Sequence, residues 1–149
     1  MREFRFKLEK LLELRRYEER EWELRLAQIT GECLLLENKI KANRGRIKLG
    51  AGQHNAGGGS LDVQQLLDGG LYLSRLYQEI TGWEKELIVK NERRAEVSKE
   101  YLEHSRRRKV LEKLKEKKAA ACYKEQLREE FKVLDDVNNG ARLRRELTN

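Results

Sequence analysis

The residues of this 149-residue chain that could do chemistry are few and scattered. Two cysteines, Cys33 and Cys122, and two histidines, His54 and His104, are the side chains that most often bind metals or act as nucleophiles. Their separations fit no metal-ligand spacing. The glycine-rich stretch at residues 50–60 contains no lysine, so it lacks the Lys–Ser/Thr pair of a phosphate-binding loop. The sequence therefore predicts a chain that is not an enzyme, with no catalytic residue, no metal site, no cofactor and no small-molecule substrate.

The two cysteines and the start of the chain indicate a cellular compartment. The cysteines lie far apart with no flanking framework, which fits a reducing environment rather than a secreted disulfide scaffold. The first ten residues offer no apolar signal-peptide core. No apolar run approaches the roughly 20 residues that are needed to span a bilayer. We therefore expect a soluble, cytoplasmic protein.

One concentrated chemical feature is a basic segment at residues 106–118. It carries eight basic and two acidic side chains, and with them most of the formal net charge of +7. Such a segment is either a solvated helix face or a surface for nucleic acid, anionic lipid or an acidic protein. Aromatic residues that could stack on bases are missing from it, and no broad apolar face accompanies it. Its candidate partner-binding residues are Arg106, Arg107, Arg108, Lys109, Lys113, Lys117 and Lys118.

The elements that must position these residues are long helices. Charged residues make up 40% of the chain and aromatic residues 7%, and proline is absent. Leu, Glu, Lys and Arg favour helix, whereas the glycines of residues 50–60 favour a flexible turn. The sequence therefore predicts one all-α domain, residues 1–149, folded as an antiparallel coiled-coil hairpin. Its helices are expected at about 2–49 and about 61–139, followed by a frayed tail at 140–149.

A heptad pattern predicts how the two helices meet. Apolar residues recur in alternating steps of four and three, which indicates a left-handed coiled coil. The predicted seam consists of Leu8, Leu12, Trp22, Leu26, Ile29 and Leu36 in the first helix and Leu73, Ile80, Trp83, Leu87, Val97 and Tyr101 in the second.

A turn centred in the glycine stretch predicts the register of this seam. It places Leu36 opposite Leu73, and it sets Glu19 opposite Lys90 so that two seam charges of opposite sign meet. The second helix is the longer one, and in this register it has no partner from Arg108 onward. The basic segment would then open an unpaired C-terminal overhang.

Two segments of the chain resemble a known family. The first is FRFKLEKLLELR at residues 4–15, followed by a Glu/Arg-rich helix that reaches Ala27. The second is RRKVLEKLKEKK at residues 107–118, followed by Tyr123 and by LDDV at residues 134–137. In this order the two segments resemble the start and the C-terminal signature of the FliJ family.

This resemblance implies a fold and a function. It implies a non-enzymatic component of the bacterial flagellar protein export apparatus, with a two-helix coiled coil similar to the stalk of rotary ATPases. The open end would enter the ring of the export ATPase (FliI-like) and promote its activity, and the hairpin would meet the cytoplasmic domain of the export gate (FlhA-like). Some members escort export chaperones. The location implied is peripheral, at the cytoplasmic face of the inner membrane.

An alternative function follows from the basic segment alone. It is a basic coiled coil that binds nucleic acid or an anionic membrane through residues 106–118. The glycine-rich residues 50–60 are a departure from the family pattern, because so flexible a turn makes a poor rigid contact.

Overall fold

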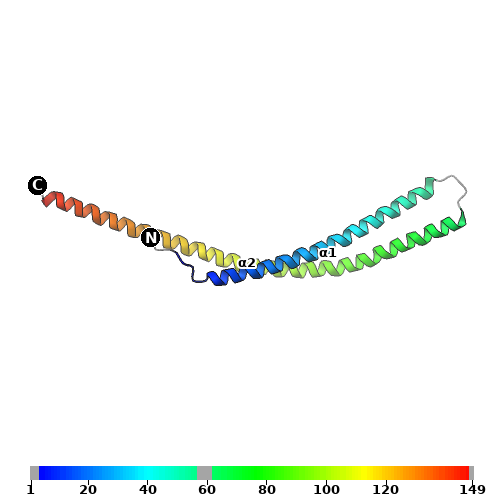
Figure 1. The fold of residues 1–149 in the computed structure, drawn as a ribbon, viewed down its shortest axis with the longest axis horizontal. Helices are drawn as coiled ribbons and strands as arrows, with labels where there is room; N and C mark the ends of the chain where they lie inside the picture. Colours follow the sequence, from blue (N-terminus) through cyan, green and yellow to red (C-terminus); the bar gives the residue numbers. More distant parts are fainter. Residues whose placement is uncertain (1–3, 57–61, 148–149) are drawn as a thin grey trace. The chain divides into compact units, whose positions relative to one another are not determined.

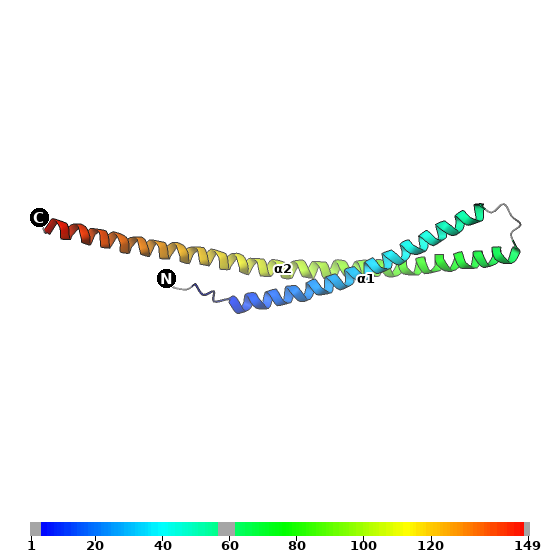
Figure 2. The ribbon, with the colours of Figure 1, turned by 45° about the horizontal axis from the view of Figure 1, so that its top comes forward.

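The computed structural model describes residues 4–56 and 62–147, and two helices contain nearly all of them. Helix α1 spans Glu9–Ala56 and helix α2 spans Val63–Leu147 (Figure 1). The helices pack against each other in antiparallel directions, as Figure 2 also shows, and the described residues contain no strand. The predicted all-α hairpin is confirmed.

Helix α1 begins and ends later than the predicted range of about 2–49. Residues 4–8 are not helical, and the helix continues through Gly50 to Ala56. A glycine inside a helix costs about 1 kcal/mol relative to alanine. At Gly50 continued packing offsets this cost, because a Cβ atom there would lie 3.6 Å from Leu73 Cδ2. The rest of the predicted turn, residues 57–60, lies outside the described residues.

Helix α2 also runs further than predicted. Before its first residue, Asp62 Oδ1 accepts a hydrogen bond from the Gln64 backbone N–H at 3.3 Å, as an N-cap does. The helix then continues through Gly140 to Leu147, where a frayed tail was expected. Two arginines in its last turn, Arg144 and Arg145, favour this extension because they complement the helix dipole.

The chain divides into two compact units, each formed by part of α1 and part of α2. We call Arg20–Glu103 the turn unit, and we call Met1–Glu19 together with His104–Asn149 the terminal unit. Each unit is described by itself.

The turn unit is held by an apolar seam. Its buried apolar side chains are Cys33, Leu36, Ile40, Leu76, Ile80 and Val97. The remaining predicted seam residues of this unit are half-buried, namely Trp22, Leu26, Ile29, Leu73, Trp83, Leu87 and Tyr101. Each fully buried aliphatic side chain contributes about 1.5–3 kcal/mol of transfer free energy. Packing of apolar residues therefore dominates this unit.

The register of the turn unit differs from the predicted one. Lys90 Nζ lies 2.7 Å from Glu32 Oε2, and Leu73 lies against Gly50 rather than Leu36. The predicted pairing was wrong by about two heptads. A slip by whole heptads keeps apolar residues facing apolar residues, so the pattern alone does not choose between registers. The continuation of α1 to Ala56 moves the turn and selects the observed one.

The terminal unit has a much smaller apolar core. Leu12 is fully buried and Phe6 nearly so, and Ser105 is its buried polar residue. Leu8, which was also predicted to lie in the seam, is 36% exposed. Ion pairs also join the two helices here, between Glu9 and Lys115, Arg16 and Glu112, and Glu19 and Arg108.

Candidate functional site

The basic segment of α2 lies opposite the start of α1 in the terminal unit. Lys115 Nζ lies 2.7 Å from Glu9 Oε2, and Arg16 Nη2 lies 3.1 Å from Glu112 Oε1. The longer second helix does extend beyond the start of α1, as predicted, but the expectation that its unpaired part begins at Arg108 was wrong. The observed register is electrostatically better, because it brings acidic residues of α1 against the most basic part of α2.

Arg108 is the most strongly engaged residue of the basic segment. Its guanidinium forms ion pairs with Glu19 of α1 and with Glu112 one turn further along α2. The predicted partner of Glu19 was Lys90, so this assignment is also corrected. A guanidinium has several donors in a fixed plane and can satisfy two carboxylates at once. Arg108 therefore holds the unit together and is poorly placed to bind a partner.

The other predicted partner-binding residues remain at the surface. The structure places Arg106, Arg107, Lys109, Lys113, Lys117 and Lys118 in exposed positions. Four of them follow helical spacing and share one side of α2. We call these four the basic face, and they are Arg106, Lys109, Lys113 and Lys117. Val110, which is 66% exposed, lies among them.

The net charge of the chain lies in the terminal unit. The terminal unit holds 20 basic and 13 acidic residues, whereas the turn unit holds 13 of each. The whole formal excess of +7 therefore lies in the terminal unit. Most of this excess lies in the basic segment and is visible in the sequence. Its partial neutralisation by α1 is not, because that depends on the register.

Ion pairing also perturbs an acidic residue beside the basic segment. A hydrogen bond from Arg15, which lies 2.8 Å away, lowers the pKa of Glu18 below its ordinary value, and His104 adds to the effect. His104 Nδ1 lies 3.5 Å from Glu18 Oε2. This cluster keeps Glu18 negatively charged at neutral pH, where it contributes to the charged contacts of the terminal unit.

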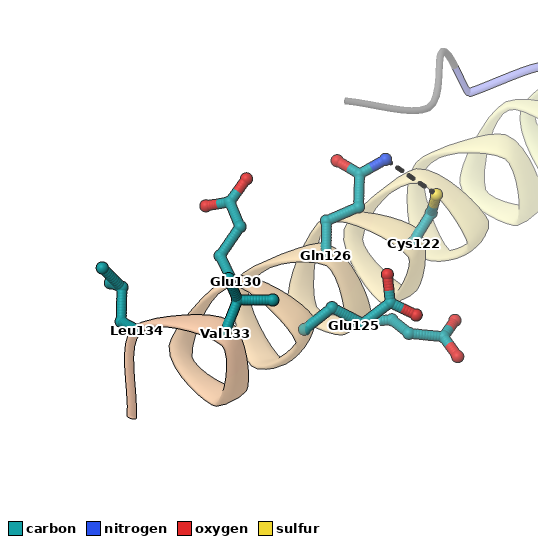
Figure 3. A pocket seen from close by; sticks show the side chains of 7 residues that line it. Cys122, Glu125, Gln126, Glu130, Val133 and Leu134 are labelled. Carbon is teal, nitrogen blue, oxygen red and sulfur yellow. Dashed lines mark hydrogen bonds between the residues drawn. The ribbon is translucent and has the colours of Figure 1, made fainter. Parts of the chain in front are cut away.

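Beyond Lys115, α2 carries an open groove that sequence analysis missed. Its lining residues are Cys122, Glu125, Gln126, Glu129, Glu130, Val133 and Leu134. Figure 3 shows that they all project from a single stretch of helix. Gln126 Nε2 donates to Cys122 Sγ at 3.8 Å. The lining residues recur at helical spacing, but four of the seven are polar, so no apolar stripe marks the groove in the sequence.

Neither a metal-binding cluster nor a membrane-spanning helix is found in the described part of the chain. Within residues 4–56 and 62–147, no group of three His, Cys, Asp or Glu side chains could hold a metal ion. Neither described helix has a stretch that is apolar enough to cross a membrane. The terminal unit exposes the cations of the basic face, and such groups attract acidic ones.

A comparison with protein families agrees with the resemblance found in the sequence. The family model described as flagellar FliJ protein matches residues 4–147, which include both helices. No curated protein and no solved structure matches the chain.

Proposed function

The chain belongs to the flagellar FliJ protein family, and from this premise we propose that it is a stalk that engages the export ATPase. Membership makes it a component of the bacterial flagellar export apparatus, and in our proposal it has no catalytic role of its own. In our proposal the terminal unit enters the ring of the FliI-like ATPase and promotes its activity. The protein then acts in the cytoplasm, at the inner face of the membrane that holds the export gate.

The observation that carries this proposal is the charge of the terminal unit. Its excess of basic residues is exposed on the basic face, where Arg106, Lys109, Lys113 and Lys117 are accessible to an acidic lining. Exposed ion pairs contribute only about 0.2–1 kcal/mol each. Several such contacts hold a stalk in a ring without fixing it at one angle, which an extensive apolar contact would do. A weak, distributed contact therefore suits a part that must turn or tilt.

We also propose that the hairpin links the ATPase to the gate. The turn unit has balanced charges, and the first turns of α2 expose Val63, Leu67 and Leu71 at helical spacing. Exposed apolar side chains that lie close together mark contacts with other proteins. They support a contact with the FlhA-like cytoplasmic domain or with export chaperones.

Binding of the purified export ATPase tests the ATPase contact. The variant Arg106→Glu, Lys109→Glu, Lys113→Glu, Lys117→Glu reverses the basic face and leaves Arg108 and Lys115 in their ion pairs. We expect it to lose most of its affinity at physiological salt while its circular dichroism spectrum stays helical. A matched control, Lys85→Glu, Lys99→Glu, changes exposed lysines of the turn unit and should bind normally.

The same preparations test the alternative function. Single-stranded DNA, duplex RNA and anionic vesicles are each titrated at two salt concentrations. Micromolar binding with a steep salt dependence, lost in the basic-face variant while ATPase binding is retained, would favour a nucleic-acid or membrane protein. If the wild-type chain does not bind the export ATPase, the stalk proposal is wrong.

A further inference from the structure

The outer face of α1 in the turn unit is unexpectedly apolar. The face opposite the buried seam carries Leu24, Leu34, Leu35 and Leu49, each more than half exposed. A helix face that meets only water usually carries charged side chains. Several exposed leucines on one face of a helix indicate that another surface covers them.

Small residues lie between these leucines at regular intervals. Gly31, Gly45 and Gly52 share one line of the helix with Asn38, each seven or fourteen residues from the next. A Cβ atom at any of the three glycines would have no atom within 4 Å. Glycine weakens a helix, and nothing inside the hairpin requires it at these positions. An approaching helix would find room there.

We propose that this face binds the same face of a second copy of the chain, with the two α1 helices antiparallel. In this arrangement residues that are equidistant from Asn38 lie opposite each other, and Asn38 lies at the two-fold axis. Three leucines then face small residues, two glycines face each other, and Leu35 lies opposite Lys41. The pairs are Leu24 with Gly52, Ala27 with Leu49, Leu34 with Ala42, and Gly31 with Gly45.

The charges of α1 support the same arrangement. Residues 20–37 hold four acidic and two basic side chains, and of these Glu32 is already paired with Lys90 of α2. Residues 39–56 hold five basic and no acidic side chains, and of these Arg44 is already paired with Glu84 of α2. Antiparallel pairing places the acidic half of each copy beside the basic half of the other, and a parallel pairing would place like charges together. This charge pattern and the alternation of sizes together select a second copy as the occupant.

Such a contact is closed by symmetry. The same patch serves both copies, so two chains satisfy each other and no filament results. The two α1 helices lie at the centre of the pair, and α2 of each copy lies outside them. The proposal does not depend on the ATPase assignment, because it uses only residues of the turn unit.

Sedimentation of the full chain over a range of concentrations tests the proposal. We expect a monomer–dimer equilibrium for the wild type. Gly45→Leu places a bulky side chain where the two helices come closest and should weaken the dimer by about tenfold or more. Gly82→Leu is the matched control, because Gly82 is also an exposed helix glycine with open space at its Cβ position. Both changes favour helix formation, so neither should unfold the chain.

A disulfide test locates the axis. Asn38→Cys in a Cys122→Ser background should form an intermolecular disulfide readily, and Glu92→Cys in the same background should not. A wild type that stays monomeric at all concentrations would overturn the proposal. A dimer that tolerates Gly45→Leu, or that crosslinks equally well through residue 92, would do the same. If Gly45→Leu instead abolishes binding to another export component while the wild type stays monomeric, the face belongs to that partner.

Discussion

Lys90 of α2 and Glu32 of α1 form an ion pair across the seam of the turn unit, with 2.7 Å between Nζ and Oε2. This hydrogen bond lowers the pKa of Glu32, with help from Gln28, and raises the pKa of Lys90. The pair also specifies the register, because a slip by one heptad would bring each residue opposite another partner. The pair adds a charged contact to a seam that is otherwise held mainly by apolar side chains.

The first prediction concerns pH. Because the pKa of Glu32 is lower in the folded state, its contribution to stability is present above the ordinary carboxylate pKa of about 4.3. That contribution is lost as the pH falls through the lowered value. We expect Glu32→Gln to reduce the melting temperature at pH 7 and to have little effect near pH 3. Circular dichroism melts of both proteins check this. A difference that stays constant with pH would show that the ion pair adds nothing.

The second prediction concerns the register. The double variant Gly50→Cys, Leu73→Cys should form a disulfide within one chain, because these positions lie together in the turn unit. The pair Leu36→Cys, Leu73→Cys should not, because disulfides require Cα atoms within about 7 Å. Mobility on a non-reducing gel, in a Cys122→Ser background, distinguishes them. A disulfide in the second pair alone would restore the register that a glycine-centred turn predicts.

The third prediction concerns the small core of the terminal unit. Leu12 is fully buried, so Leu12→Ala should cost about 2–5 kcal/mol of stability in this unit. Leu14 lies on the same helix and is half exposed, and Leu14→Ala should cost far less. Hydrogen exchange of the amides of α1 within this unit measures both. Equal losses of protection would mean that Leu12 is not a core residue.

The fourth prediction separates the two units by salt. The terminal unit relies on ion pairs of Arg108, Lys115 and Arg16, whereas the turn unit relies on apolar packing. Salt screens exposed charges, and the Debye length falls to about 3 Å at 1 M. We expect amide protection in residues 9–19 to fall at high salt, while protection in residues 33–43 is maintained. Uniform behaviour of both segments would contradict this division.

Much of the fold could be predicted from the sequence, and the reasons are local. The absence of proline and the heptad steps through Cys33, Leu36 and Ile40 specify long helices with one buried stripe. These features depend only on spacing along one helix. The family resemblance required two segments, and it was confirmed by a match over nearly the whole chain.

The register and the helix ends could not be predicted because they depend on competition between long-range terms. The glycines around Gly50 suggested a turn, but the packing of Leu73 and the charged contacts of the basic segment together outweigh their cost. The same shift in register decides which basic residues are exposed to a partner. Arg108 and Lys115 pair with α1, whereas Lys113 is exposed. Only the register of the two helices distinguishes these residues.

Stimulation of the purified export ATPase by the full-length chain tests the central claim most directly. The wild type should raise the ATP hydrolysis rate. The variant Arg106→Glu, Lys109→Glu, Lys113→Glu, Lys117→Glu should fail to do so at physiological salt, although its melting temperature is nearly unchanged. The control Lys85→Glu, Lys99→Glu should stimulate as the wild type does. Full stimulation by the basic-face variant would contradict the account and would show that the face is merely solvated.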